Sequence, residues 1–157
     1  KGQGVSVAGM NANDVWVKLA RCCTPVPGDE IIGFITRGQG VSVHQSSCPN
    51  AIRLQGLHPE RFVEVSWSGE HSQAQYLVQI QTKALDRPGL LADMTKVMTD
   101  YRVNILSAST VSTRDQVATA RFSFELAEIS HLNAVLSALR RVDGVFEAVR
   151  VSTSAAQ

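Results

Sequence analysis

The chain has 157 residues, of which 44% are hydrophobic and 18% charged, with a net charge of +1. This composition predicts a packed core and excludes a disordered chain. The near-neutral charge excludes a broad basic surface, so contact with nucleic acid would depend on local patches. No apolar run reaches the roughly 20 residues of a membrane span, and the N-terminus shows no apolar leader, so we expect a cytoplasmic protein without a membrane partner. Because the sequence does not begin with Met, we expect it to be a fragment of a longer protein.

Residues 1–67 predict a small, mainly β domain with one helix. Short runs of β-type residues alternate with turn residues, and the expected elements are strands over 5–7, 15–19, 30–36 and 41–44, a helix over 46–54 and a strand over 62–67. The first two strands are expected to form a hairpin, as are the third and fourth. In the helix, Ser47 is the candidate N-cap, and Pro49 suits the first turn.

All three cysteines lie in this domain. Cys22 and Cys23 are adjacent, and His44 and Cys48 follow them. Three thiolates and one imidazole are the donor set of a closed tetrahedral zinc site, although adjacent cysteines depart from the usual Cys-x2-4-Cys spacing. Two other interpretations stay open, a redox-active thiol group and small buried side chains without a ligand. The clustering is unlike a secreted disulfide framework and fits a reducing cytoplasm.

Residues 68–75 are polar and turn-prone, and we expect a linker there. From residue 76 the pattern predicts the order β-α-β-β-α-β, with two amphipathic helices on one face of an antiparallel sheet. We therefore expect an α+β protein in which a small mainly-β, zinc-finger-like domain precedes a ferredoxin-like domain over 76–157. The other sheet face and the sheet edges favour a homodimer through the second domain.

The sequence resembles two known families. The segment from Tyr76 to Val151, with Asp-Arg-Pro-Gly-Leu-Leu at 86–91 and Val-Asn-Ile at 103–105, is similar to the ACT domain. The Cys-Cys-x-Pro-x-Pro-Gly-Asp-x-Ile-x-Gly stretch from Cys22, followed by His44 and Cys48, resembles the conserved-cysteine, zinc-finger or RIS domain. That domain precedes ACT in long RelA/SpoT-type (p)ppGpp synthetase/hydrolases, and actinobacterial bifunctional enzymes are the nearest type.

This resemblance implies a non-catalytic regulatory fragment of a stringent-response enzyme. In the family, the C-terminal half senses amino-acid starvation through the ribosome and uncharged tRNA and controls the catalytic half. The resemblance also implies binding of a branched-chain amino acid, valine or isoleucine, at a paired-domain interface. The helix start after 86–89 suits a carboxylate, and Asp86 or Asn104 could take the ammonium. The candidate binding residues are Asp86, Arg87, Gly89, Leu90, Leu91, Asn104 and Ile105.

Two alternatives remain on the sequence alone. One is a module that binds ribosomal RNA and dimerises without a small ligand, with Arg21, Arg37 and Arg53 as candidate phosphate contacts. These arginines could equally be scattered solvated charges. The other is a zinc hydrolase or thiol oxidoreductase, which we disfavour because three Cys and one His leave no open position on the metal. An ACT domain without any ligand is a further alternative to amino-acid binding.

Overall fold

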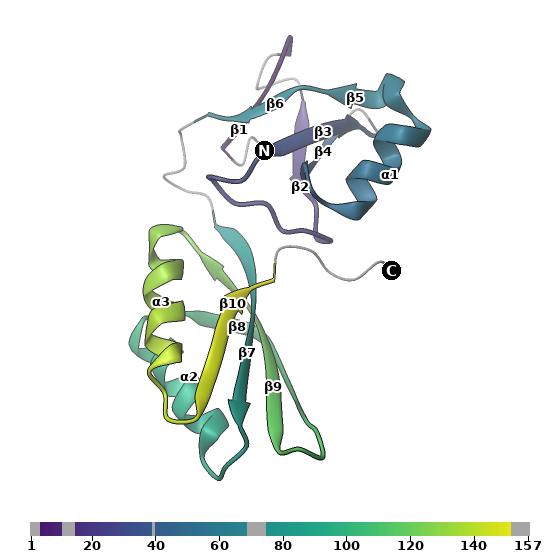
Figure 1. Ribbon diagram of the computed structural model, residues 1–157. Coiled ribbons are helices and arrows are strands. Elements are labelled where there is room, and N and C mark those ends of the chain that lie inside the picture. The colour runs from purple at the N-terminus through teal and green to yellow at the C-terminus, as the bar shows by residue number, and fades with distance from the viewer. Residues whose placement is uncertain (1–3, 11–14, 39, 69–74, 152–157) are drawn as a thin grey trace. The chain divides into compact units, whose positions relative to one another are not determined.

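The computed structural model describes residues 4–10, 15–38, 40–68 and 75–151 (Figure 1). These residues divide into an N-terminal unit, which runs to Tyr76, and a C-terminal unit, Leu77–Val151. Most of the linker expected over 68–75 lies outside the described residues. In the described part of the chain, no helix combines the length and hydropathy needed to cross a bilayer.

The N-terminal unit is built on two sheets. The larger sheet has four strands in the order β2(Trp16–Leu19), β4(Gly40–Gln45), β3(Ile31–Ile35) and β5(Phe62–Val63). Strands β3 and β4 form the predicted antiparallel hairpin, whereas β2 runs parallel to β4. The smaller sheet pairs β1(Val5–Val7) with β6(Val65–Trp67).

Two sequence predictions about these strands are wrong. The first two strands do not form a hairpin, because β1 pairs with β6 and β2 pairs with β4. The segment between them, 8–14, is longer than common hairpin loops, so local turn composition misled the prediction. The strand expected over 62–67 is interrupted at Glu64, and its halves, β5 and β6, join different sheets. Alternating hydrophobicity indicates which face of a strand is buried, but it does not predict which strand pairs with it.

The two faces of the four-stranded sheet are covered differently. On one face the valines of β2 and β4 pack against those of β1 and β6, forming a core of Val5, Val7, Val15, Val17, Val41, Val43 and Val65. Gly33 belongs to this face, because a Cβ there would lie 2.8 Å from Val65 Cγ1. On the other face, α1(Pro49–Leu57) and the loop at 20–24, called the cysteine loop below, cover Phe34 with Cys23, Cys48 and Ala51.

Helix α1, which the sequence predicted over 46–54, begins three residues later, at Pro49. Its N-cap is Cys48, which has extended dihedral angles and makes no side-chain capping bond. Ser47 is therefore not the N-cap, whereas Pro49 occupies the first turn as predicted. A short 3-10 helix, η2(Pro59–Arg61), then leads into β5.

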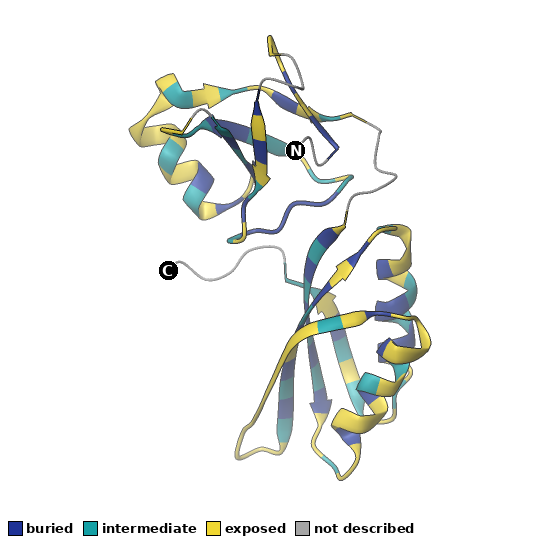
Figure 2. Ribbon diagram, turned by 180° about the vertical axis from the view of Figure 1, so that it is seen from behind, coloured by how far each residue is buried: buried dark blue, intermediate teal, exposed yellow. Residues whose placement is uncertain are grey.

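The C-terminal unit has the predicted βαββαβ order and α+β class. Its elements are β7(Tyr76–Leu85), α2(Leu90–Asp100), β8(Asn104–Ser112), β9(Val117–Leu126), α3(Ser130–Arg140) and β10(Val145–Arg150). The sheet order is β10-β7-β9-β8, and both helices lie on one face (Figure 1). Buried residues alternate with more exposed ones along β7 and β9, as Figure 2 shows. Thus Phe122 and Phe124 of β9 face the core.

Candidate functional site

A tight turn brings the two adjacent cysteines to the same side of the chain. The Thr24 N–H donates to the Ala20 carbonyl at 2.9 Å, which closes a single helical turn around Cys22 and Cys23. Thr24 has φ +43°, so the chain leaves this turn in a conformation that few non-glycine residues adopt. In an extended chain neighbouring side chains would diverge. Here the two Sγ atoms are 4.0 Å apart.

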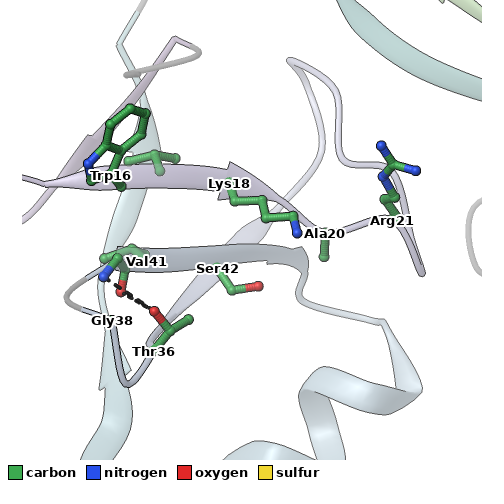
Figure 3. A pocket seen from close by; sticks show the side chains of 10 residues that line it. Trp16, Lys18, Ala20, Arg21, Thr36, Gly38, Val41 and Ser42 are labelled. Atoms are coloured by element: carbon green, nitrogen blue, oxygen red, sulfur yellow. Dashed lines mark hydrogen bonds between the residues drawn. The ribbon is translucent and has the colours of Figure 1, made fainter.

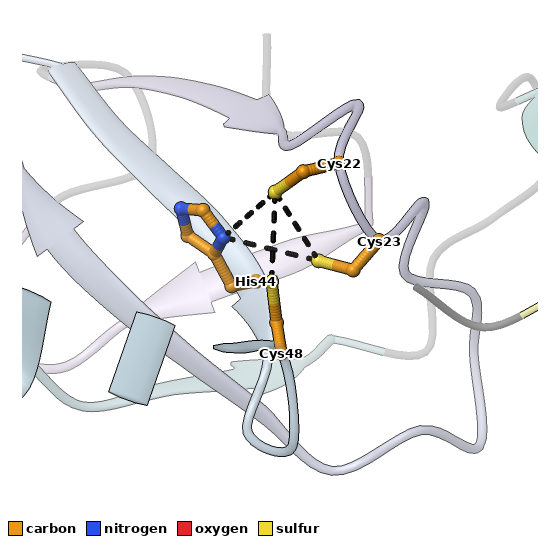
Figure 4. A group of neighbouring side chains, drawn as sticks. All are labelled: Cys22, Cys23, His44 and Cys48. Carbon is orange, nitrogen blue, oxygen red and sulfur yellow. Dashed lines mark hydrogen bonds between the residues drawn. The ribbon is translucent and has the colours of Figure 1, made fainter. Parts of the chain in front are cut away.

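Cys22, Cys23, His44 and Cys48 converge into one cluster (Figure 4). Their ligand atoms all lie within 4.8 Å of one another. Cys22 Sγ is 3.4 Å from His44 Nδ1 and 3.6 Å from Cys48 Sγ. Two sulfur ligands at about 2.3 Å from a tetrahedral zinc ion lie roughly 3.8 Å apart. The spacing of the cluster therefore fits a zinc ion with four protein ligands.

The electrostatics of the cluster agree with a cation at its centre. Burial raises the pKa of the Cys22 and Cys23 thiols and lowers the pKa of His44. The imidazole is thus kept neutral, as a metal ligand must be, whereas buried thiolates require a nearby positive charge. The Gln45 backbone N–H also donates to Cys23 Sγ at 3.2 Å. A divalent ion with this amide would compensate the charge of the thiolates.

Ser42 orients the histidine, and the sequence analysis missed it. Its Oγ lies 3.2 Å from His44 Nε2, while Nδ1 of the same ring faces the sulfurs. With Nδ1 as the ligand atom, Nε2 carries the proton and donates it to Ser42 Oγ. The available signal was strand periodicity, because Ser42 precedes His44 by two residues on β4 and shares its sheet face.

The candidate amino-acid site in the C-terminal unit is more dispersed. Asp86 Oδ2 accepts a hydrogen bond from Ser112 Oγ at 2.7 Å. The Arg87 guanidinium donates to Asp93 at 2.8 Å and to the Asp143 carbonyl at 2.9 Å, so both side chains have structural partners. Gly89, with φ +80°, is the N-cap of α2. A hollow of about 370 Å³ lies beside this loop, lined by Asp86, Arg87, Pro88 and Gln116.

The remaining candidates for that site are not brought together in one chain. Leu90 is buried in the core, whereas Leu91 is exposed. Asn104 and Ile105 begin β8, and Asp86 binds Ser112, which ends it. Eight residues of extended strand span about 26 Å. The two candidate ammonium ligands, Asp86 and Asn104, therefore lie at opposite ends of β8.

The three candidate phosphate contacts lie on three different elements of the N-terminal unit, and all are exposed. Arg21 follows β2 and lines a surface groove. Arg37 lies in the turn between β3 and β4. Arg53 lies on α1 and donates to Asn50 Oδ1 at 3.0 Å.

Two family models match the chain, one to each unit. Residues 5–68 match the RelA/SpoT RIS domain, and residues 72–150 match the ACT domain. The chain also resembles a solved structure titled as the ACT domain from a GTP pyrophosphokinase of Chlorobium tepidum. That likeness has 23% identity and a TM-score of 0.45, and covers 50% of this chain and all of that one.

Curated relatives match nearly the whole chain. A GTP pyrophosphokinase of Streptomyces coelicolor is 55% identical over 151 residues, which are 96% of this chain and 17% of the relative. The bifunctional (p)ppGpp synthase/hydrolase RelA of Mycobacterium tuberculosis is 51% identical over 97% of this chain and 20% of its own length. The GTP pyrophosphokinase of Escherichia coli K12 is 42% identical over 87% of this chain and 18% of its own length. The chain thus spans about a fifth or less of these relatives.

Proposed function

Because the chain belongs to the RelA/SpoT family, as an RIS domain followed by an ACT domain, we propose that it is a non-catalytic regulatory region of a stringent-response (p)ppGpp synthetase/hydrolase. The observation that carries this proposal is the pairing of a cluster of four potential metal ligands, called the metal cluster below, with an ACT domain. Such a cluster leaves no coordination position for substrate, so its role is structural. In the cytoplasm, the region would sense amino-acid starvation and control the catalytic domains by binding one of their conformations more tightly.

We assign the metal as zinc, which orders the N-terminal unit. The four ligands come from three separate segments, namely the loop at 20–24, strand β4 and the start of α1. One ion would tie these segments across a small core of Ala20, Cys23, Phe34, Cys48 and Ala51. Small domains with thin cores commonly need such a staple.

The C-terminal unit would dimerise through the edge strand β8. Nine residues of β8 carry no charge, and Leu106 and Val111 are 51% and 64% exposed. An unpaired, uncharged edge favours pairing with a second copy. The opposite edge, β10, carries charged residues, and its Ala148 carbonyl accepts two bonds from Arg140. This contrast favours β8 as the interface.

Dimerisation of this kind would assemble the dispersed amino-acid site. If two β8 strands pair antiparallel about Ala108, Asn104 of the partner subunit comes opposite Ser112, which already binds Asp86. The α-carboxylate of valine or isoleucine would then meet the free N–H groups at the start of α2. The ammonium would bind Asp86 and the partner's Asn104, so each ligand would need both copies.

Calorimetric titration with valine and isoleucine tests this assignment. We expect saturable heat at millimolar ligand or below, lost in Gly89→Arg and reduced in Asn104→Ala. Gly89→Ala is the matched control, because it imposes the same strain at φ +80° without a long side chain. His131→Ala, an exposed change on α3, should have no effect. Absence of heat and of a thermal shift at millimolar ligand would contradict amino-acid sensing.

Contact with ribosomal RNA and uncharged tRNA is the second candidate function, with dimerisation but no small ligand. It is favoured by the basic groove at Arg21. Its signature is binding of RNA that weakens steeply with added salt. Binding of RNA without any response to valine would identify this alternative.

A further inference from the structure

The N-terminal unit carries a groove of about 580 Å³ on the same sheet face as the metal cluster. Figure 3 shows Trp16, Lys18 and Arg21 in that order along β2 and the loop after it. The groove is also lined by Gly40, Ser42 and Thr36. The volume lies within the range of pockets that hold small molecules.

The groove exists because one part of this sheet face is left uncovered. Trp16 pairs with Gly40, and Lys18 pairs with Ser42, so these four positions form two adjacent rows. Gly40 brings no side chain, and a Cβ there would lie 3.3 Å from Thr36 Oγ1. The space beside the Trp16 indole is therefore open, and Trp16 is 67% exposed. Farther along β4, the next side chain on this face is His44, which the cysteine loop covers.

The charged side chains that line the groove are all basic. Lys18 and Arg21 are both exposed, and within the described residues neither forms an ion pair. No acidic side chain is among the described residues that line the groove. Trp16 and Lys18 lie on one face of β2, about 7 Å apart along the strand. A flat apolar surface thus lies next to two cations and the Ser42 hydroxyl.

We propose that this groove binds an unpaired nucleotide, with its base stacked on Trp16 and its phosphate held by Lys18 and Arg21. A nucleobase and its 5′-phosphate are separated by about one sugar, which matches the spacing of the ring and the cations. Stacking is worth about 1–3 kcal/mol per base and accepts any base. The nucleotide can be free or belong to a single strand, since both present the same chemistry.

This inference rests on the proposed RNA contact only for the single-strand source of the nucleotide, and it is independent of amino-acid binding. It adds Trp16, Lys18 and Ser42 to Arg21, one of the three arginines that the sequence analysis named as candidate phosphate contacts. Ser42 also contacts His44, so the groove and the metal cluster share one strand and one side chain. The site is thereby held by a rigid part of the unit.

Tryptophan fluorescence tests the proposal in the complete 157-residue chain. A Trp67→Phe background leaves Trp16 as the remaining tryptophan, because the chain has two. Titration with guanosine monophosphate, with a six-nucleotide single-stranded RNA and with duplex RNA should show quenching by the first two ligands. We expect Trp16→Ala, followed by fluorescence anisotropy of labelled ligand, to weaken binding roughly tenfold or more. Trp16→Phe should retain most of the affinity.

The charged half of the groove is tested by Lys18→Gln and Arg21→Gln, with Arg141→Gln, an exposed change at the end of α3, as the matched control. Each groove variant should weaken binding severalfold and reduce its salt dependence, whereas the control should not. Binding of the single strand alone still supports the groove and identifies RNA as the source. RNA affinity unchanged by Trp16→Ala would overturn the groove while leaving RNA contact intact. If neither guanosine monophosphate nor the single-stranded RNA binds, the groove proposal and RNA contact are both overturned. Melting curves verify that these exposed substitutions leave the fold unchanged.

Discussion

The two units of this chain reach order by different means. The C-terminal unit has long strands and large buried side chains, including Phe122, Phe124 and Ile80. The N-terminal unit has short strands, and three of its buried residues are polar, namely Thr24, His44 and Gln45. Its second core consists of cysteines, Phe34 and alanines. Apolar area thus stabilises one unit, whereas we propose that a metal ion bound by the four clustered residues orders half of the other.

Metal removal should produce the largest effect and should separate the two units. A structural zinc site contributes roughly 10–16 kcal/mol of apparent binding free energy in small zinc domains. We therefore expect chelation, or Cys23→Ser, to unfold the N-terminal unit and leave the C-terminal unit folded. Both tryptophans, Trp16 and Trp67, lie in the N-terminal unit, so their fluorescence follows the folding of that unit.

The measurements are zinc content, tryptophan fluorescence and backbone amide exchange. One zinc per chain is expected in the native protein and none in Cys48→Ser, whereas Ser46→Ala, a half-exposed neighbour, should keep the metal. Full zinc occupancy in Cys48→Ser, or native fluorescence after chelation, would contradict the metal assignment. Reversible Cys22–Cys48 disulfide formation in metal-free protein would instead favour the redox interpretation.

The reciprocal experiment is a cavity in the C-terminal core. Phe122 is 1% exposed, and Phe122→Ala should destabilise this unit by about 3–5 kcal/mol. Denaturant unfolding followed by amide exchange should show the loss over β7 to β10, with tryptophan fluorescence unchanged. A matched change at the surface, Phe146→Ala on β10, should cost far less because Phe146 is 58% exposed. A parallel loss of fluorescence would mean that the units do not fold independently.

These differences explain how far the sequence could predict each unit. The long amphipathic segments of the C-terminal unit carry strong periodicity, and their order was predicted correctly. In the N-terminal unit the strands are three to six residues long apart from β5, and periodicity could not assign β1 to β6 or β2 to β4. The convergence of Cys22, Cys23, His44 and Cys48 was predicted from their donor chemistry. The turn at Thr24 that aligns Cys22 with Cys23 was not, because threonine rarely takes positive φ.

Acid should release the metal and so weaken the N-terminal unit selectively. Burial raises the pKa of Cys22 and Cys23 above the ordinary value of 9.0, so both thiols are protonated in the metal-free folded state at neutral pH. Zinc binding must displace at least these two protons, so the apparent affinity should fall by at least about 100-fold for each unit decrease in pH. Competition with a chromogenic chelator measures this slope. A slope near zero would show that the thiols do not bind the metal.

The smallest effects come from deleting one buried or half-buried hydroxyl in each unit. In the N-terminal unit, Ser42→Ala removes the acceptor for His44 Nε2 and should lower zinc affinity about 10- to 100-fold, as loss of such a partner does at other metal sites. In the C-terminal unit, Thr82 Oγ1 donates to Met94 Sδ at 3.4 Å, and thioether sulfur is a weak acceptor. Thr82→Val should therefore change the free energy of unfolding by less than about 1 kcal/mol. Chelator competition measures the zinc affinity of Ser42→Ala, and denaturant unfolding measures the stability of Thr82→Val. The free energy of unfolding lost in Thr82→Val could equal the free energy of zinc binding lost in Ser42→Ala. Directional polar contacts would then order both units, and the contrast between an apolar core and a core ordered by metal ligands would fail.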